Sequence, residues 1–185
     1  MMGDILIRVL PTPNPNAWKF VINKPVLNEG KATFAVASEA LGLKLVEDLF
    51  DVVGVSQIHL FTNVITITCK DGTDSERFKE EASAVIQTRM WLHDPNYNQQ
   101  EQKKQSGRQN HTPEMNKIEE ILDMTIRPGL QGDGGDIEIV ALEGKRLIVR
   151  YQGACGTCPS AMSGTLMAIE GILHDEYDPE LEVIP

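Results

Sequence analysis

The stretch that decides the fold of the second half of the chain is RLIVRYQGACGTCPSAMSGTLMAIEGIL, residues 146–173. It opens with RLIVRYQ, which is rich in β-branched and aromatic residues and predicts a strand. It closes on a run that places apolar residues, Ile169 and Leu173 among them, on one face of a helix. Between the two stand Cys155 and Cys158, three positions apart, among glycines and in front of a proline. The stretch therefore predicts a strand, a cysteine-containing turn and a helix in succession.

The residues around this stretch complete an α-β-β-α-β domain over residues 113–185. TPE at 112–114 is typical of a capped helix start, with proline at the first helical position. Pro-Gly at 128–129 predicts the end of that helix, and QGDGGD at 131–136 predicts a tight glycine-rich turn. IEIVAL then pairs with RLIVRYQ as a hairpin, and LEVI at 181–184 adds a last strand.

The first part of the chain, residues 1–93, has the pattern of a second small α+β domain with a mostly antiparallel sheet. Strands are predicted over ILIRVL and WKFVI, and over VSQIHLF and VITITC, which flank a Thr-Asn turn as a hairpin. Ser38 predicts the cap of one helix. Thr73 and Glu76 form the capping-box pattern of a second, longer helix.

The clearest boundary in the chain is DPNYNQQEQKKQSGRQNHT, residues 94–112, which contains no Val, Ile, Leu, Met or Phe. Such a segment cannot bury enough apolar surface to offset the entropy lost on ordering. We therefore expect a flexible linker here, between a domain over 1–93 and a domain over 113–185.

Composition excludes several classes of function. The 185 residues carry a formal net charge of −10, so we expect no nucleic-acid partner, because phosphate backbones repel such a chain. No run of about 18 apolar residues occurs, so we expect no membrane span. The N-terminus lacks a secretory or transit pattern, which favours a cytoplasmic location, with a mature form in the mitochondrial matrix as the alternative. Only three cysteines occur, which indicates a reducing compartment and metal or redox chemistry for a close pair.

Several kinds of site use two cysteines at this spacing. Cys155 and Cys158 are predicted just before a helix N-terminus, where unpaired N–H groups and the helix dipole favour thiolates. Two inert buried cysteines, a thioredoxin-like redox pair, a zinc site and an iron–sulfur site all compete. The vicinity lacks the tryptophan expected before a thioredoxin-like pair, and zinc needs about four ligands, where this domain adds only a distant His174.

A 4Fe–4S cluster also takes four thiolates, and this domain offers two. The count is satisfied if two copies of the chain meet about a twofold axis and each supplies one pair, since isologous dimers are the commonest symmetric assembly. A cluster in such a homodimer would lie at the subunit boundary, near solvent. A carrier of clusters without turnover and a thiol–disulfide oxidoreductase both remain open from the residues alone.

The segment from IRPGLQGDGGD through GACGTCPS to EGIL, residues 126–173, resembles the NifU-like C-terminal domain of Nfu-type iron–sulfur proteins. TPNPNAWKF and the pair DVVGV and ITIT resemble the N-terminal domain that is fused to it in that family. The resemblance implies a non-enzymatic scaffold or carrier that receives a 4Fe–4S cluster from upstream assembly proteins and passes it to apo-proteins. It also implies that Cys155 and Cys158 are the ligands. The chain departs from the pattern in the Gly-Thr between the cysteines and in its long linker.

The other candidate residues favour structural roles. Cys69 ends a predicted strand and is interpreted as a small core residue. His59 is interpreted as a surface or packing residue. Asp133 and Asp136 flank two glycines and suit a turn better than carboxylate chemistry.

Overall fold

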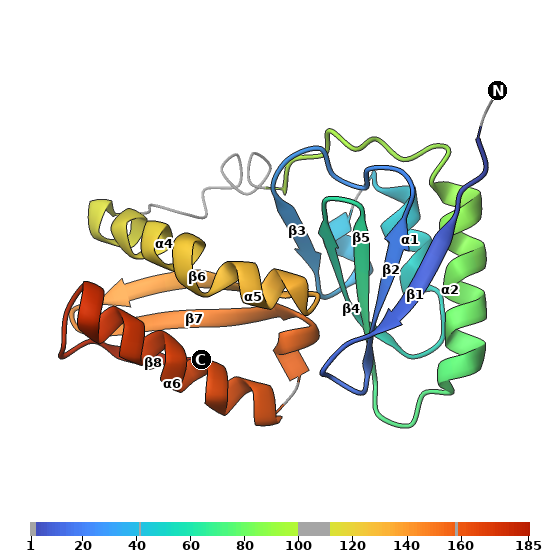
Figure 1. Cartoon of the computed structure of the whole chain (residues 1–185). Helices are drawn as coiled ribbons and strands as arrows, with labels where there is room; N and C mark the ends of the chain where they lie inside the picture. Colours follow the sequence, from blue (N-terminus) through green and yellow to red (C-terminus); the bar gives the residue numbers. More distant parts are fainter. Residues whose placement is uncertain (1–2, 41, 100–111, 158) are drawn as a thin grey trace.

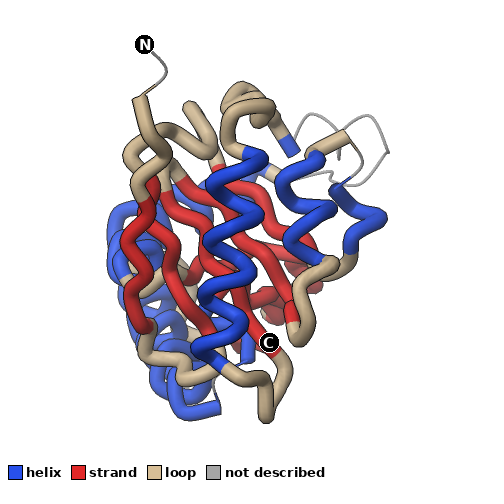
Figure 2. The backbone as a smooth tube through the Cα atoms, turned by 90° about the vertical axis from the view of Figure 1, so that its right-hand side faces the viewer, coloured by secondary structure: helices blue, strands red, loops and turns tan. Residues whose placement is uncertain are grey.

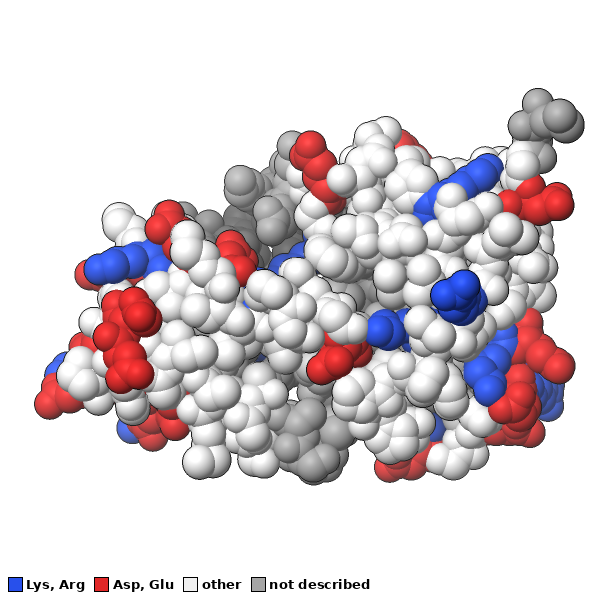
Figure 3. Space-filling view, viewed as in Figure 1, with Lys and Arg blue, Asp and Glu red and all other residues white. Residues whose placement is uncertain are grey.

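The computed structural model describes residues 3–40, 42–99, 112–157 and 159–185. The predicted α+β class is confirmed, with two domains joined in sequence (Figure 1). Among the described residues, no helix is long and apolar enough to cross a bilayer. In the view of Figure 3, acidic and basic side chains are interspersed over both domains, and no continuous basic surface is seen.

The first domain is a five-stranded sheet in the order β1-β2-β5-β4-β3, in which all neighbouring strands are antiparallel. Its elements in chain order are β1 (Ile7–Pro11), β2 (Ala17–Ile22), β3 (Lys31–Phe34), the 3-10 helix η1 (Ala37–Ala40), α1 (Lys44–Phe50), β4 (Val55–Phe61), β5 (Val64–Cys69) and α2 (Ser75–Arg89). The hairpin of β4 and β5 across a Thr-Asn turn is therefore confirmed, while β3 had no prediction.

The starts of both helices in this domain differ from the sequence-based prediction. Ser38 lies in η1 and caps no α-helix, and α1 begins only at Lys44. The cap of α2 is Asp74, whose carboxylate accepts hydrogen bonds from the N–H groups of Glu76 and Arg77. The hydroxyl of Thr73 instead donates to the carbonyl of Lys70, at 2.6 Å. Both Thr and Asp are good cap residues, and here the side chain one position later reaches the free N–H groups.

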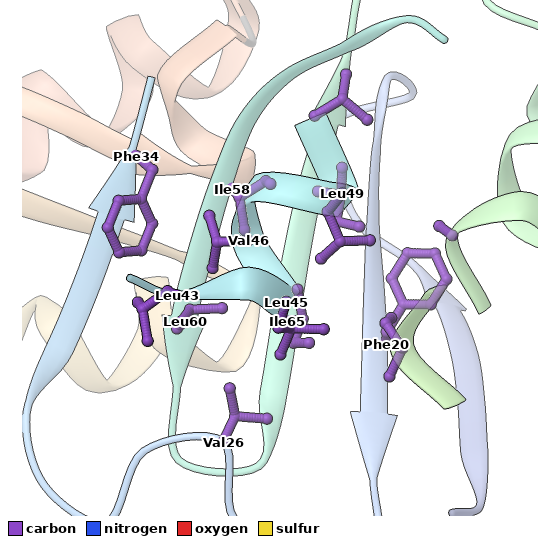
Figure 4. Packing of buried hydrophobic residues seen from close by; sticks show 14 of the residues in the cluster. Phe20, Val26, Phe34, Leu43, Leu45, Val46, Leu49, Ile58, Leu60 and Ile65 are labelled. Carbon is purple, nitrogen blue, oxygen red and sulfur yellow. The ribbon is translucent and has the colours of Figure 1, made fainter. Parts of the chain in front are cut away.

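Helices α1 and α2 cover one face of the sheet, and the apolar core lies between them and the strands (Figure 4). Alternate strand residues such as Phe20, Ile58 and Ile65 point into this core and are fully buried. Phe20 meets Phe78 of α2 edge to face, with ring centroids 5.9 Å apart. The opposite face of the same strands therefore carries the other, mostly polar, set of side chains.

Residues 94–99, the first part of the predicted linker, contact the first domain. Tyr97 packs against its core and lies beside the ring of Phe34. The side-chain amide of Gln99 accepts a hydrogen bond from the N–H of Thr33 and donates one to its carbonyl, at 2.9 and 2.8 Å. Thr33 lies in β3, at the edge of the sheet. Residues 100–111 are outside the described part of the chain.

The second domain places three helices against a three-stranded sheet in the order β6-β7-β8. Its elements are α4 (Pro113–Thr125), α5 (Arg127–Gly132), β6 (Gly135–Glu143), β7 (Arg146–Gly153), the 3-10 helix η2 (Ala154–Thr157), α6 (Pro159–Glu176) and β8 (Glu182–Ile184). β6 and β7 are antiparallel, and β8 runs parallel to β7. The hydroxyl of Thr112 accepts from the N–H of Met115, which confirms the predicted cap of α4.

One prediction for this domain is wrong. Helix α4 ends at Thr125, close to the predicted end at Pro128-Gly129, but residues 127–132, RPGLQG, form a further short helix, α5, that overlaps the turn predicted over residues 131–136. Proline is tolerated because it lies in the first turn of α5, where no helical partner for an N–H exists. The turn is reduced to Asp133 and Gly134, and strand β6 already begins at Gly135.

Candidate functional site

The site is built on the connection from β7 to α6. Cys155 is the second residue of η2, two positions after the last strand residue Gly153 and four positions before α6 begins at Pro159. The strand-turn-helix order predicted around the cysteines is therefore confirmed. Cys158 falls outside the described residues, so its assignment as a ligand remains a prediction.

The thiol of Cys155 points into the second domain and is only 7% exposed. It lies directly over Gly135, the first residue of β6. A Cβ atom on Gly135 would be 2.3 Å from the sulfur, far inside van der Waals contact. The absence of a side chain at Gly135 therefore provides the space that the Cys155 sulfur occupies. The second glycine of the DGGD motif thus has a specific role beside the cysteine.

Backbone contacts hold the turn to the same glycine pair. The N–H of Ala154 donates to the carbonyl of Gly134, at 3.1 Å. Gly153 has φ +64°, and a Cβ there would be 2.4 Å from that carbonyl oxygen. Both the left-handed backbone and the close approach require glycine at position 153. The GAC and DGGD motifs are therefore two halves of one packed structure.

Tyr151 supports the turn from β7. Its hydroxyl donates to the carbonyl of Met162 on α6, at 3.3 Å. Burial, with a smaller contribution from the neighbouring Cys155, raises the pKa of Tyr151 to about 12. The phenol therefore stays neutral and serves as a hydrogen-bond donor between β7 and α6.

Asp136 is a charged residue inside the protein, in strand β6, and not the turn residue that the sequence favoured. Its carboxylate is fully buried, 2.7 Å from the ammonium of Lys31 and 3.3 Å from the guanidinium of Arg127. It also accepts hydrogen bonds from Gln131 and from the N–H of Ile137. Burial alone would raise the pKa of Asp136, but the Lys31 charge and these bonds hold the pKa below its usual value. The residue is an ion-pair anchor, since burial of a charge requires such partners.

Cys69 lies in a different core from Cys155. Its side chain joins the apolar cluster of the first domain, which confirms its interpretation as a core residue, whereas Cys155 joins the cluster of the second. Burial raises the pKa of the Cys69 thiol to about 11. Among the described residues, no group of three or more His, Cys, Asp or Glu side chains could hold a metal ion. Cys69 is thus not placed to join a site at Cys155.

We call Gly153 together with η2 (Ala154–Thr157) the cysteine turn. Sequence reasoning missed the residues of the first domain that contact it. The side-chain amide of Asn14 donates to the carbonyl of Ala154 at 2.9 Å, and the hydroxyl of Thr68 donates to the carbonyl of Gly153 at 3.4 Å. These partners are 140 and 85 positions apart. No local pattern could reveal them, although Asn14 belongs to the TPNPN stretch that carried the family resemblance.

Comparison with known proteins now identifies the family. Residues 7–91 match the family model described as the scaffold protein Nfu/NifU N-terminal domain, and residues 118–184 match the NifU-like domain. The mitochondrial NFU1 iron-sulfur cluster scaffold homolog of Homo sapiens is 30% identical over 179 residues, which are 96% of this chain and 70% of that protein. The chain therefore belongs to the Nfu family, in which an Nfu N-terminal domain precedes a NifU-like domain.

Two further relatives match most of this chain. Mitochondrial NifU-like protein 4 of Arabidopsis thaliana is 30% identical over 91% of this chain, and NifU-like protein C1709.19c of Schizosaccharomyces pombe is 30% identical over 97% of it. The chain spans 62% of the length of the first and 71% of the second. The human and Arabidopsis proteins are named mitochondrial, which agrees with the mitochondrial alternative and gives the cytoplasmic expectation no support.

Two solved structures resemble parts of the chain. A NifU-like protein from Saccharomyces cerevisiae matches 48% of this chain and 80% of its own, with 22% identity and a TM-score of 0.43. Protein SAV1430 from Staphylococcus aureus matches 45% of this chain and 99% of its own, with 20% identity and a TM-score of 0.40.

Proposed function

We propose that this protein is an iron–sulfur cluster scaffold or carrier, which binds a 4Fe–4S cluster through Cys155 and Cys158 and delivers it to apo-proteins. The observation that carries the proposal is the position of Cys155 in the turn between β7 and α6 of a NifU-like domain. The name of the human relative, an iron-sulfur cluster scaffold homolog, supports the role. It also favours a mitochondrial location over the cytosol. Nothing in these comparisons favours the thiol–disulfide oxidoreductase alternative.

The number of cysteines supports a cluster shared between two chains. The sequence has three, and the structure directs Cys69 into the core of the first domain. One chain therefore offers two thiolates, while a 4Fe–4S cluster takes four. Two copies related by a twofold axis would complete the set. The cluster is cargo in this proposal, so it must leave again, and a site at a subunit boundary permits that.

Reconstitution with iron and sulfide under anaerobic conditions tests the proposal. The wild-type chain should take up about four irons per two chains and show the broad visible absorption of a cluster. Cys155→Ser and Cys158→Ser should each lose stable binding while the far-UV circular dichroism spectrum is retained. Cys69→Ser, the matched control, should bind as wild type does. A wild-type level of iron in the Cys155→Ser variant would refute the ligand assignment.

Light scattering of the same samples tests the shared site. Two short turns bury less surface than the roughly 1,200 Å² of a stable interface, so the apo chain should be monomeric or weakly associated. The loaded protein should be a dimer, and a chelator should return it to the apo state, because binding and assembly are linked. A monomer that holds a complete cluster would contradict the model and point to outside thiols such as glutathione.

A further inference from the structure

The face of the five-stranded sheet that α1 and α2 leave open is turned toward the second domain (Figures 1 and 2). It carries polar side chains together with some apolar ones, such as Val21 and Val64. In each strand, the residues between the core positions point to this face. Thr66 and Thr68 of β5 alternate with Ile65, Ile67 and Cys69 of the core. We call the following residues the polar sheet face: Lys19, Lys31, Gln57, His59, Thr66 and Thr68.

The polar sheet face and the loop before β2 hold the cysteine turn by its backbone. Asn14 donates to the carbonyl of Ala154, and Thr68 donates to the carbonyl of Gly153; both contacts are buried. These two carbonyls immediately precede Cys155. The first domain therefore contacts the segment that must move if the buried thiol is to turn outward.

Contacts of two lysine ammonium groups lie on either side of these two hydrogen bonds. The ammonium of Lys31 is 2.7 Å from the buried carboxylate of Asp136 and 3.2 Å from the carbonyl of Ile137. The ammonium of Lys19 donates to the carbonyl of Gly132, at 2.7 Å. The domains are thus joined on either side of Gly135, the residue against which the thiol packs.

Gly134 of the second domain makes the close approach possible. A Cβ on Gly134 would be 2.8 Å from the side chain of Lys19 and 3.0 Å from the hydroxyl of Thr66. Gly156 also faces the first domain, but a Cβ there would be 3.5 Å from the side chain of Gln57, an ordinary van der Waals contact. In this structure, the first domain occupies the space beside Gly134 and Gly156.

The chemistry of the contact is that of an interface that opens. The apolar cores of the two domains are separate clusters, so no continuous core joins them. Two buried atoms of the polar sheet face, Gln57 Oε1 and His59 Nε2, have no hydrogen-bond partner within the described chain. Water would satisfy both on separation, which disfavours the closed arrangement. Polar contacts between domains of one chain are typical of dissociable interfaces.

We propose that the first domain is an intramolecular cover for the cysteine turn: it holds the turn closed with the Cys155 thiol buried against Gly135, and it must undock before that thiol can bind iron. The inference rests on the proposed function for the step it controls. A second copy of the turn cannot approach the carbonyls of Gly153 and Ala154 while Asn14 and Thr68 occupy them. Undocking and dimerisation about a cluster would therefore be coupled.

Thiol alkylation of the reduced, cluster-free full-length chain tests the cover directly. The double variant Lys31→Gln, Thr68→Val removes one ion pair and one hydroxyl contact between the domains. Iodoacetamide labelling of Cys155, followed by peptide mass spectrometry, should be faster than in wild type by on the order of tenfold, the effect of losing one charge-assisted contact. Cys69 should stay slow, because it reports on the intact core of the first domain.

The matched control is Lys44→Gln, Thr88→Val. Lys44 forms an ion pair of the same 2.7 Å length with Asp48, and the Thr88 hydroxyl donates to a backbone carbonyl at 2.8 Å, but both contacts lie within the first domain. The control should label at the wild-type rate. If neither double variant accelerates Cys155, the thiol is protected by the second domain alone and the cover is refuted.

Faster labelling of Cys69 in the Lys31→Gln, Thr68→Val variant, which we call the interface variant, would indicate an unfolded first domain. In that case a second pair of variants tests the cover. Gly134→Ala places a methyl group against Lys19 and Thr66, whereas Gly144→Ala introduces the same strain of positive φ in an open hairpin turn. Faster labelling of Cys155 in Gly134→Ala alone supports the cover. Equal rates in the two variants overturn it.

Cluster uptake by the same variants separates this inference from the proposed function. If the interface variant labels faster and also loads iron and sulfide faster than the control, both proposals are supported. Faster labelling with no cluster in any variant, wild type included, leaves the cover in place and refutes the cluster site. Normal cluster uptake, together with equal Cys155 labelling rates in wild type and all variants, supports the cluster site and refutes the cover.

Discussion

Gly153→Ala should destabilise the second domain far more than Gly144→Ala, although the two glycines have nearly the same backbone conformation. Their φ angles are +64° and +62°, so both substitutions force alanine into the left-handed region, which costs about 1 kcal/mol. The surroundings differ. A Cβ on Gly153 would be 2.4 Å from the Gly134 carbonyl oxygen and 3.1 Å from the Cα of Gly135, whereas a Cβ on Gly144 has no neighbour within 4 Å.

The additional contact is with backbone, which cannot move aside as a long side chain can. Overpacking of this kind adds about 1–3 kcal/mol. We therefore expect Gly144→Ala to lower the free energy of opening by about 1 kcal/mol and Gly153→Ala to lower it by about 2–4 kcal/mol. Native-state hydrogen exchange of the β6 and β7 amides measures both values within this domain. Agreement of the two values within about 0.5 kcal/mol would refute the packing of the GAC turn on the DGGD turn.

Further predictions concern other buried groups. Gly135→Ala should destabilise the second domain by about 1–3 kcal/mol, and adding Cys155→Ala should restore much of the loss in thermal melts, because the sulfur is the clashing atom; an additive double variant would contradict this. Burial lowers the pKa of His59 to about 4 from 6.5, so the unfolded chain takes up the proton first as pH falls. The docked arrangement that buries His59 should be fully retained above pH 6.5 and should lose up to about 3 kcal/mol toward pH 4, by undocking or by unfolding, a loss that a denaturant series should find reduced in His59→Gln. Asp74→Ala should lower the stability of the first domain by about 1 kcal/mol in urea unfolding followed by tryptophan fluorescence, and an unchanged midpoint would exclude the cap.

The order of elements could be predicted because the signals for it are local. The hairpin of β4 and β5 follows from two β-rich runs around a two-residue turn, and the start of α4 follows from a Thr-Pro pair. The four residues of β3 were missed because KATF is short and has no turn residues that distinguish it from a loop. The helix RPGLQG was not predicted because it is only six residues long and contains both proline and glycine, while the contacts of Arg127 with Glu119, Asp123 and Asp136 involve residues outside it.

The position of Cys155 in the chain fold could be predicted from the sequence, but the residues that contact the site from a distance in sequence could not. The placement of Cys155 between a strand and a helix follows from residues within twenty positions of it. The burial of its thiol against Gly135, and the ion pair of Asp136 with Lys31, join segments whose spacing in sequence carries no signal. A charged residue beside two glycines is ordinarily a turn residue, and its partners here come both from the first domain, through Lys31, and from the second, through Arg127.

The amide of Gln99 on the N–H and carbonyl of Thr33 has a consequence for self-association. β3 is an outer strand of its sheet, and outer strands with unpaired backbone groups can pair with another copy of the same chain. Gln99 satisfies one donor and one acceptor of that strand with a side chain, which, unlike a strand, cannot propagate a ladder. A segment whose composition predicts little structure thus contains, at Gln99, a residue that covers part of a sheet edge on which another chain could pair. Any shortened form of the first domain would need to retain it.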